Sequence, residues 1–275
     1  MAGFIWLVSY PKSGNTWVRI LLNNYRLDAN APPVLDIPLL GDQQHLSRHL
    51  FDEATGLVSS ELSEDELQQY RLLFHQQFVR KFDGISFAKV HEAYRPQPGV
   101  SSAFPANAAC KAVYLVRNPL DIVPSFAHHE NVSSDRIIDH MADCSAVVRH
   151  SETAFDERLG SWSDHVSGWT RQDAIETLVV RYEDMLADPH AAFSRLILFS
   201  GLPLDSARLA KAINMSRFDR LQASERAIGF RERPFRASHF FRSGRSGAWR
   251  ETLTARQVER IVADHSGIMQ TVGYA

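Results

Sequence analysis

The chain opens with an apolar run that ends in a glycine-containing turn and passes directly into a helical pattern. Residues 4–8 read Phe-Ile-Trp-Leu-Val, which is typical of a buried strand. The turn runs from Ser9 to Gly14, and apolar residues then recur at helical spacing over 15–26. Ligands of open parallel sheets bind beyond the carboxyl ends of the strands, and a helix N-terminus attracts anions. This order therefore predicts a phosphate-binding loop.

Three further apolar runs, at 85–90, 112–116 and 177–180, are separated by helical stretches. Continuous apolar strands that alternate with helices indicate a parallel sheet covered on both faces. We predict helices over 63–82, where Ser63 and Glu66 form a capping box, from about 120, over 188–199 and from 254 onward. Residues 29–56 show little periodicity and are predicted to be a long loop. The fold class is α/β, a single domain over 1–275 with a central, mostly parallel sheet flanked by helices.

Composition excludes several classes of protein. Apolar residues make up 44% of the 275 residues and charged residues 23%, which rules out wholesale disorder. Two cysteines cannot form a disulfide scaffold, no apolar run reaches membrane-spanning length, and the N-terminus has no signal-peptide features. We therefore expect a cytoplasmic protein that binds neither nucleic acid nor membrane.

The net charge of −2 conceals one basic segment. Between Arg231 and Arg250 there are six arginines and a single acid, Glu232. A nucleic-acid-binding protein usually carries a broad basic excess, whereas a confined excess suits one small anion. A solvated surface loop is the alternative interpretation.

The turn at 9–14 has the chemistry of an anion cradle. Gly14 permits close backbone approach, Lys12 adds a positive charge, and Ser13 and Thr16 add hydroxyl donors. In the Walker pattern the lysine follows the glycine, whereas Lys12 precedes Gly14, which disfavours an ATP or GTP hydrolase. The alternative is a surface turn with an incidental lysine.

Residues 10–17, Tyr-Pro-Lys-Ser-Gly-Asn-Thr-Trp, closely resemble the 5′-phosphosulfate loop of the cytosolic-type sulfotransferases. Those enzymes use 3′-phosphoadenosine 5′-phosphosulfate (PAPS) as sulfuryl donor and release adenosine 3′,5′-bisphosphate (PAP). Asn15 stands where the family has threonine; because asparagine also donates a hydrogen bond, we expect anion binding to survive. Residues 114–125, 181–185 and 242–250 resemble further family motifs in the same order. The resemblance spans roughly residues 4 to 260.

The resemblance implies a role for each matching residue. Arg117 and Ser125, with Arg242 and the backbone of Gly244, would hold the 3′-phosphate, and Trp17 would contact adenine. The implied donor-binding residues are Lys12, Ser13, Gly14, Asn15, Thr16, Trp17, Arg117, Ser125, Tyr182, Ser216, Phe218, Arg242, Ser243 and Gly244.

The chain also departs from the family pattern. Ser243 replaces a lysine, for which Arg245 is a candidate substitute, and Ala248 replaces an aspartate. The dimerisation motif of the family is matched in part over 250–259, so a homodimer is possible.

His91, two residues after Lys89 at the end of the second predicted strand, is the predicted general base. Alternation places both side chains on one side of the strand, and imidazole titrates near neutral pH. The family carries a Lys-x-His pair here, which implies that His91 takes the acceptor proton, Lys89 assists, and Lys12 stabilises the leaving phosphate. Most of the twelve histidines should be structural. His128 and His129 are the next candidates and could line an acceptor pocket, but we expect them to be structural.

The predicted reaction is in-line transfer of the sulfuryl group of PAPS to a hydroxyl or amine of a small-molecule acceptor, without a metal ion. A P-loop-like small-molecule kinase and a non-catalytic nucleotide-binding module are the alternatives. Asp121 is expected to complement a helix dipole or an arginine. Large apolar side chains could line an acceptor pocket or belong to the core: Phe51, Phe74, Phe78, Phe126 and Trp162.

Overall fold

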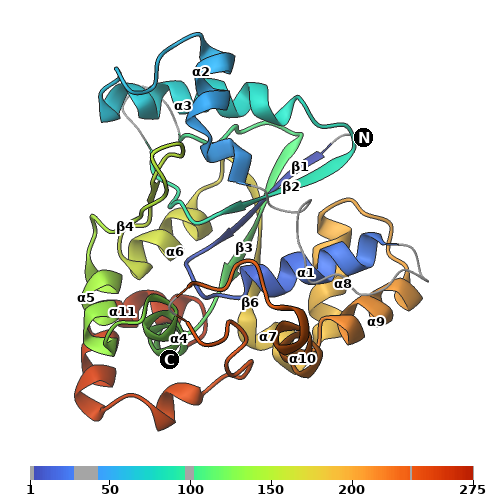
Figure 1. Ribbon diagram of the computed structural model, residues 1–275, viewed down its shortest axis with the longest axis vertical. Coiled ribbons are helices and arrows are strands. Elements are labelled where there is room, and N and C mark those ends of the chain that lie inside the picture. The colour runs from blue at the N-terminus through green and yellow to red at the C-terminus, as the bar shows by residue number, and fades with distance from the viewer. Residues whose placement is uncertain (1–2, 28–42, 97–101, 236, 275) are drawn as a thin grey trace.

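Four parallel strands form the centre of the computed structural model, which describes residues 3–27, 43–96, 102–235 and 237–274 (Figure 1). Their order across the sheet is β2-β1-β3-β6, with bounds Ile85–Val90, Gly3–Ser9, Cys110–Val116 and Glu176–Arg181. All four predicted strands are confirmed. The fold is a single α/β domain, as the sequence predicts.

The register of the sheet brings three distant segments together. On one side of β1, Val8 pairs with Val90, and on the other side Ser9 pairs with Leu115. The strands β1, β2 and β3 therefore end at the same end of the sheet, just before Lys12, His91 and Arg117. Parallel strands place their following loops side by side in this way.

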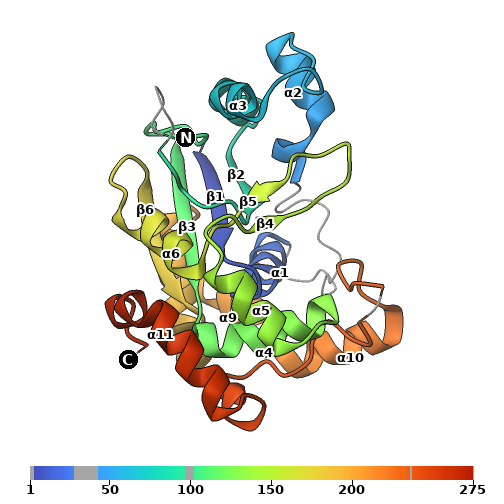
Figure 2. The ribbon, with the colours of Figure 1, turned by 90° about the vertical axis from the view of Figure 1, so that its left-hand side faces the viewer.

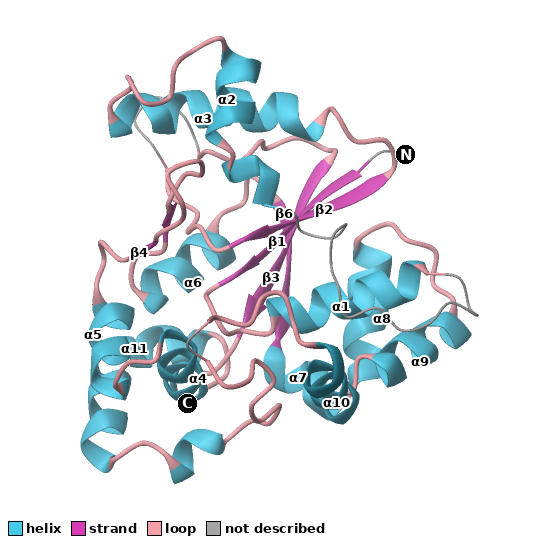
Figure 3. Cartoon of the chain, in the orientation of Figure 1, coloured by secondary structure: helices cyan, strands magenta, loops and turns pink. Residues whose placement is uncertain are grey.

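Alternate residues of the strands face two separate cores, and helices cover both faces of the sheet (Figure 3). One core holds Leu7, Val113 and side chains of α1, α7, α8 and α9, whose bounds are Asn15–Arg26, Tyr182–Ala187, Pro189–Phe199 and Ser206–Met215. The other holds Trp6, Tyr114 and side chains of α3, α4, α5, α6 and α11, which span Glu64–Val79, Pro119–Glu130, Ser134–Ala142, Trp162–Arg171 and Ala255–Thr271.

Smaller elements complete the fold. The helix α10 (Phe218–Ile228) lies with α4 and α5 beyond the end of the sheet that is far from the N-terminus, as Figure 2 shows. The two-residue strands β4 (Val147–Val148) and β5 (Glu157–Arg158) pair antiparallel, and η2 spans Ala248–Glu251. None of the helices among the described residues is long and apolar enough to cross a membrane.

The prediction of a long loop over 29–56 is wrong for its second half, where the structure has helices. Residues 28–42 lie outside the described residues, but η1 (Gln43–Leu46) and the helix α2 (Arg48–Thr55) follow. Ser47 caps α2 by accepting a hydrogen bond from the backbone N–H of Leu50, and the fully buried Phe51 packs in the core. The helix has only two turns, which is too short to give a clear period. The predicted helices at 63–82, 188–199 and 254 are confirmed, and the capping box of Ser63 and Glu66 is present.

Candidate active site

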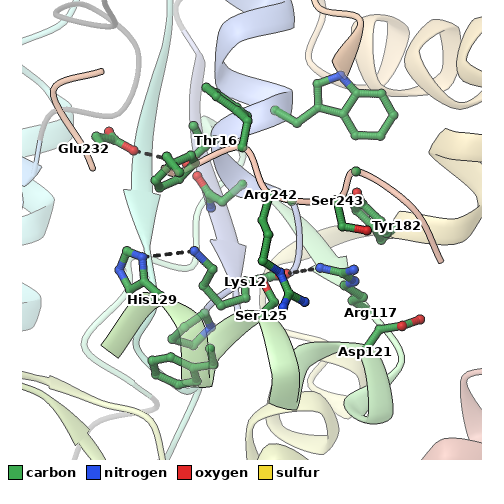
Figure 4. Close-up of a pocket in the computed structure, with 18 of the residues that line it drawn as sticks. Lys12, Thr16, Arg117, Asp121, Ser125, His129, Tyr182, Glu232, Arg242 and Ser243 are labelled. Atoms are coloured by element: carbon green, nitrogen blue, oxygen red, sulfur yellow. Dashed lines mark hydrogen bonds between the residues drawn. The ribbon is translucent and has the colours of Figure 1, made fainter. Parts of the chain in front are cut away.

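A cavity of about 860 Å³ opens at the carboxyl ends of the parallel strands (Figure 4). Lys12 from the first loop, Arg117 from the end of β3 and Arg242 from the C-terminal basic segment all line it. Lys89 and His91 line it from the end of β2. Segments that are more than a hundred residues apart in the sequence thus converge on one cavity.

The first loop owes its shape to two left-handed residues, Lys12 (φ 71°) and Gly14 (φ 98°). A β-carbon at Gly14 would lie 2.8 Å from the ring of Tyr182, so only glycine fits. The amide of Asn15 donates to the carbonyl oxygen of Leu7 (2.9 Å) and to Oγ of Ser9 (3.2 Å). This side chain therefore holds the loop against β1. That anion binding survives the exchange of threonine for Asn15 stays a prediction.

The two hydroxyl groups of the loop differ. The Oγ atom of Ser13 is fully buried and has no hydrogen-bond partner among the described residues. Thr16 donates to Oε2 of Glu232 (3.1 Å), whose Oε1 lies 2.8 Å from Nη2 of the buried Arg19. Sequence reasoning missed Glu232 as a cavity residue, although it is the one acid in the arginine-rich segment.

Lys12 lies in a positive environment. Burial, with the charges of Arg117 and Lys89, lowers its pKa to about 7. Its Nζ donates to Nδ1 of His129 (3.2 Å) and lies 4.6 Å from the centre of the Phe240 ring. Because lowered lysine pKa values result from unbalanced positive charge and burial, the loop favours an added anion.

The two histidines of α4 differ in position. His129 lines the cavity, so a purely structural reading does not describe it, and burial with the charge of Lys12 lowers its pKa to about 4. His128 donates from Nε2 to the carbonyl oxygen of His239 (3.1 Å), which is a structural contact.

His91 has the geometry of a proton acceptor. Its Nδ1 lies 2.7 Å from the carbonyl oxygen of Ser9, so Nδ1 carries the proton and Nε2 has a free lone pair. Burial and the charge of Lys89 lower the pKa of His91 to about 3, which keeps the imidazole neutral. The backbone N–H of His91 donates to Oε1 of Glu157.

A second group of positive charge lies around Arg117. Its guanidinium donates to the carbonyl oxygens of Lys12 (3.0 Å) and Arg245 (3.3 Å). It also stacks on the ring of Tyr182, 4.2 Å from the ring centre. Its buried Nε has no hydrogen-bond partner among the described residues. Burial and the charge of Arg117 lower the pKa of Arg242. Ser125, Ser243 and Gly244 line the same part of the cavity.

Arg245 does not replace the missing lysine at 243. Its guanidinium hydrogen-bonds Ser243 Oγ (3.2 Å) and pairs with Glu251, and it does not line the cavity. Asp121 lies in the first turn of α4 as expected, but its carboxylate pairs with no arginine of the described residues. It accepts from the backbone N–H groups of Gly247 (2.7 Å) and Trp249 (3.1 Å), which fixes the C-terminal basic segment to α4.

Beside Arg117 and Gly244 the wall of the cavity is flat and aromatic. Trp17, Tyr182 and Phe218 line it, together with Ser216, whose buried Oγ has no partner among the described residues. A β-carbon at Gly244 would lie 2.1 Å from the Phe218 ring. Of the apolar side chains considered for an acceptor pocket, Phe126 lines the cavity, whereas the others are buried in the core: Phe51, Phe74, Phe78 and Trp162.

The cavity therefore fits an elongated polyanion with an aromatic group. Lysines and arginines line it, among them Lys12, Lys89, Arg117 and Arg242, and the unpartnered buried hydroxyl of Ser216 is part of the same lining. Buried polar atoms normally find partners, so Ser216 Oγ, which belongs to the cavity lining, indicates a missing ligand.

Comparisons with known proteins agree with this chemistry. The family model described as "Sulfotransferase domain" matches residues 3–270. Sulfotransferase 1C2 of Rattus norvegicus is 23% identical over 261 residues, covering 92% of this chain and 79% of that protein. Cytosolic sulfotransferase 17 of Arabidopsis thaliana is 27% identical over 281 residues, covering 92% and 70%.

Two solved structures share the fold. Mouse sulfotransferase SULT7A1 complexed with PAP has a TM-score of 0.61 at 19% identity, covering 98% of this chain and 85% of that one. Retinol dehydratase in complex with androsterone and PAP has a TM-score of 0.62 at 18% identity, covering 97% and 80%.

Proposed function

The chain belongs to the sulfotransferase family, and from this premise we propose that it transfers the sulfuryl group of PAPS to a hydroxyl or amine of a small-molecule acceptor. The observation that carries the proposal is the convergence of Lys12, Arg117 and Arg242 on the cavity that His91 also lines. A kinase is less consistent with the loop, because Lys12 precedes Gly14.

The donor would lie along the cavity from its aromatic wall to the end of β2. Trp17, Tyr182, Phe218 and Ser216 would hold adenine, since flat rings bind a planar base by stacking. Arg117 and Arg242, with Ser125, Ser243 and the Gly244 backbone, would hold the 3′-phosphate, because a guanidinium fork matches phosphate oxygens. Lys12, Ser13, Thr16 and the backbone N–H groups that begin α1 at Asn15 would hold the 5′-phosphosulfate.

The residues of the chain divide the work of transfer. When bound, PAPS supplies the sulfuryl group and a phosphate that leaves with negative charge. His91 accepts the acceptor proton at Nε2 as the acceptor atom forms its bond to sulfur. Lys12 provides positive charge at the leaving oxygen, and Lys89, on the same side of β2 as His91, provides it beside the sulfuryl oxygens.

The acceptor would occupy the remainder of the cavity, near Phe126, Phe240 and His129. The acceptor of this chain is not specified by these side chains, which combine apolar and polar character. Relatives that are named cytosolic support a cytoplasmic site of action. A homodimer stays a prediction.

A labelled-donor assay tests the proposal. With ³⁵S-labelled PAPS and a panel of phenols, alcohols and amines, we expect transfer by the wild type, and tighter binding of PAPS than of ATP. We expect His91→Ala to lower kcat by about 10²–10⁴-fold while PAP still binds. The control is His128→Ala, which removes a histidine outside the cavity. Normal turnover by His91→Ala refutes the assigned base, and preferential binding of ATP refutes the assigned donor.

A further inference from the structure

A fully buried carboxylate lies behind the strand end that carries His91. Glu157, the first residue of β5, has a side chain with 0% exposure. Its Oε1 accepts from the backbone N–H of His91 (2.5 Å), and its Oε2 accepts from Nε2 of His150 (3.1 Å). Within the described part of the chain, it forms no ion pair with a lysine or an arginine. Among the described residues, its hydrogen-bond donors are the His91 backbone, the His150 ring and the Gln43 amide (3.5 Å).

The carboxylate is nevertheless ionised. Burial opposes the charge, but the hydrogen bonds from the His150 ring and from the His91 backbone N–H favour it, and the pKa of Glu157 is lowered to about 2. Burying a charge without a close counter-ion is costly. An amide of the same shape would satisfy the His91 N–H at lower cost. The charge itself therefore needs an explanation.

The surroundings of His91 suggest what the charge does. The residue is fixed at three atoms: Nδ1 donates to Ser9, the backbone N–H donates to Glu157, and the carbonyl oxygen accepts from Nε2 of His165 (3.0 Å). Nδ1 of His165 is held in turn by the hydroxyl of Tyr114 (2.9 Å). These contacts leave Nε2 of His91 as the ring atom available to a substrate.

Burial and Lys89 both oppose a positive charge on His91, whereas the charge of Glu157 favours it. A base next to a lysine needs such a counter-charge at the moment when it takes a proton. In a low-dielectric interior, the charge of a carboxylate bonded to the His91 backbone acts strongly on the ring of the same residue.

We propose that Glu157 is a positioning residue for sulfuryl transfer: it fixes the end of β2 through the His91 N–H, and its negative charge stabilises the imidazolium that forms as His91 takes the acceptor proton. The proton moves from the acceptor to Nε2 of His91, and Glu157 stays ionised throughout. This inference rests on the proposed function.

Three variants separate charge from shape. Glu157→Gln keeps the size and an acceptor oxygen for the His91 N–H but removes the charge. Glu157→Asp keeps the charge and shortens the side chain. Asp156→Asn is the matched control, because it removes one charge at the neighbouring position, where Asp156 accepts from the backbone of His150 (2.8 Å) and does not contact His91.

The readouts are kcat and the KM for PAPS from initial rates after a jump from pH 7 to values between pH 2 and 9, a range that includes the pKa of His91, with 2-naphthol as the probe acceptor, and PAP affinity by calorimetry. We expect Glu157→Gln to lower kcat about tenfold, part of the 10²–10⁴-fold that a general base contributes, with KM and PAP affinity unchanged. The acid limb of its kcat profile should move to lower pH. Glu157→Asp and Asp156→Asn should keep the wild-type acid limb.

A Glu157→Gln enzyme with wild-type kcat and acid limb overturns the inference, as does an equal shift in Asp156→Asn. If Glu157→Gln does not fold, Glu157→Asp decides: a lower kcat with an unmoved limb supports the inference, and a moved limb overturns it. Failure of the proposed function looks different, because the wild type itself would then neither bind PAP nor transfer sulfuryl groups.

Discussion

Arg242 offers a clean test of where the two phosphate ends of the donor lie. Its guanidinium lines the cavity beside Arg117, and within the described residues it makes no hydrogen bond or ion pair. Arg117, in contrast, also holds the carbonyl oxygens of Lys12 and Arg245. Arg242→Ala therefore removes the proposed contact with the 3′-phosphate, and we expect little change in the stability of the protein.

The expected loss follows from the charge-assisted hydrogen bond that a phosphate would make. One such bond contributes about 1.5–3 kcal/mol, which corresponds to about a 10- to 150-fold rise in Kd. Adenosine 5′-phosphate lacks the 3′-phosphate, so its Kd should change less than about twofold. The ratio of the two Kd values, rather than either value alone, reports the position of the 3′-phosphate.

Isothermal titration of PAP and of adenosine 5′-phosphate into wild type and variant measures this ratio. Arg245→Ala is the matched control, because Arg245 lies three residues away, pairs with Glu251 and does not line the cavity. Equal weakening of both nucleotides by Arg242→Ala would refute the assignment. An equal loss in Arg245→Ala would show that only the general positive potential matters.

Further predictions concern protons and the basic segment. The pKa of Lys12 is about 7 in the free protein, and a bound anion favours the charged form, so PAP binding at pH 8 should be accompanied by proton uptake. Calorimetry in buffers of different ionisation enthalpy should detect this uptake in the wild type and find none in Lys12→Met. Burial lowers the pKa values of His45 and His165 to about 4, so the unfolded chain binds more protons below pH 6.5 and stability falls as pH drops from 6.5 to 4. Each histidine should cost about 2 kcal/mol at pH 5, which thermal melting across this range can check. Asp121→Ala frees the backbone N–H groups of Gly247 and Trp249, so it should lower both the melting temperature and the affinity for PAP, whereas Asp121→Asn should lose less.

The sequence predicts the parts of the fold whose signal is local. The strand at Ile85–Val90 and the helix at Asn15–Arg26 have the predicted bounds, because buried parallel strands are continuously apolar and α1 carries a clear helical period. The short α2 was missed for the opposite reason, since two turns give too few repeats to distinguish from a loop.

Site residues that depend on long-range pairing were harder to find. Glu157 carries no local pattern that marks it as a neighbour of His91, 66 residues earlier. Glu232 was visible only as an exception in a basic segment, and its contacts with Thr16 and Arg19 require the folded chain. The Asn15 side chain was assigned by chemical type alone, which gives no information about the direction in which it points.

The left-handed backbone at Lys12 has a cost that the protein bears permanently. A residue with a β-carbon in that conformation is disfavoured by about 1–2 kcal/mol relative to glycine, and the penalty exists whether or not substrate is present. A Lys12→Gly protein would have a relaxed loop and a higher melting temperature, yet it would lack the cation that we propose for the leaving oxygen. Under the proposed function, selection for thermal stability and selection for turnover therefore favour different residues at position 12.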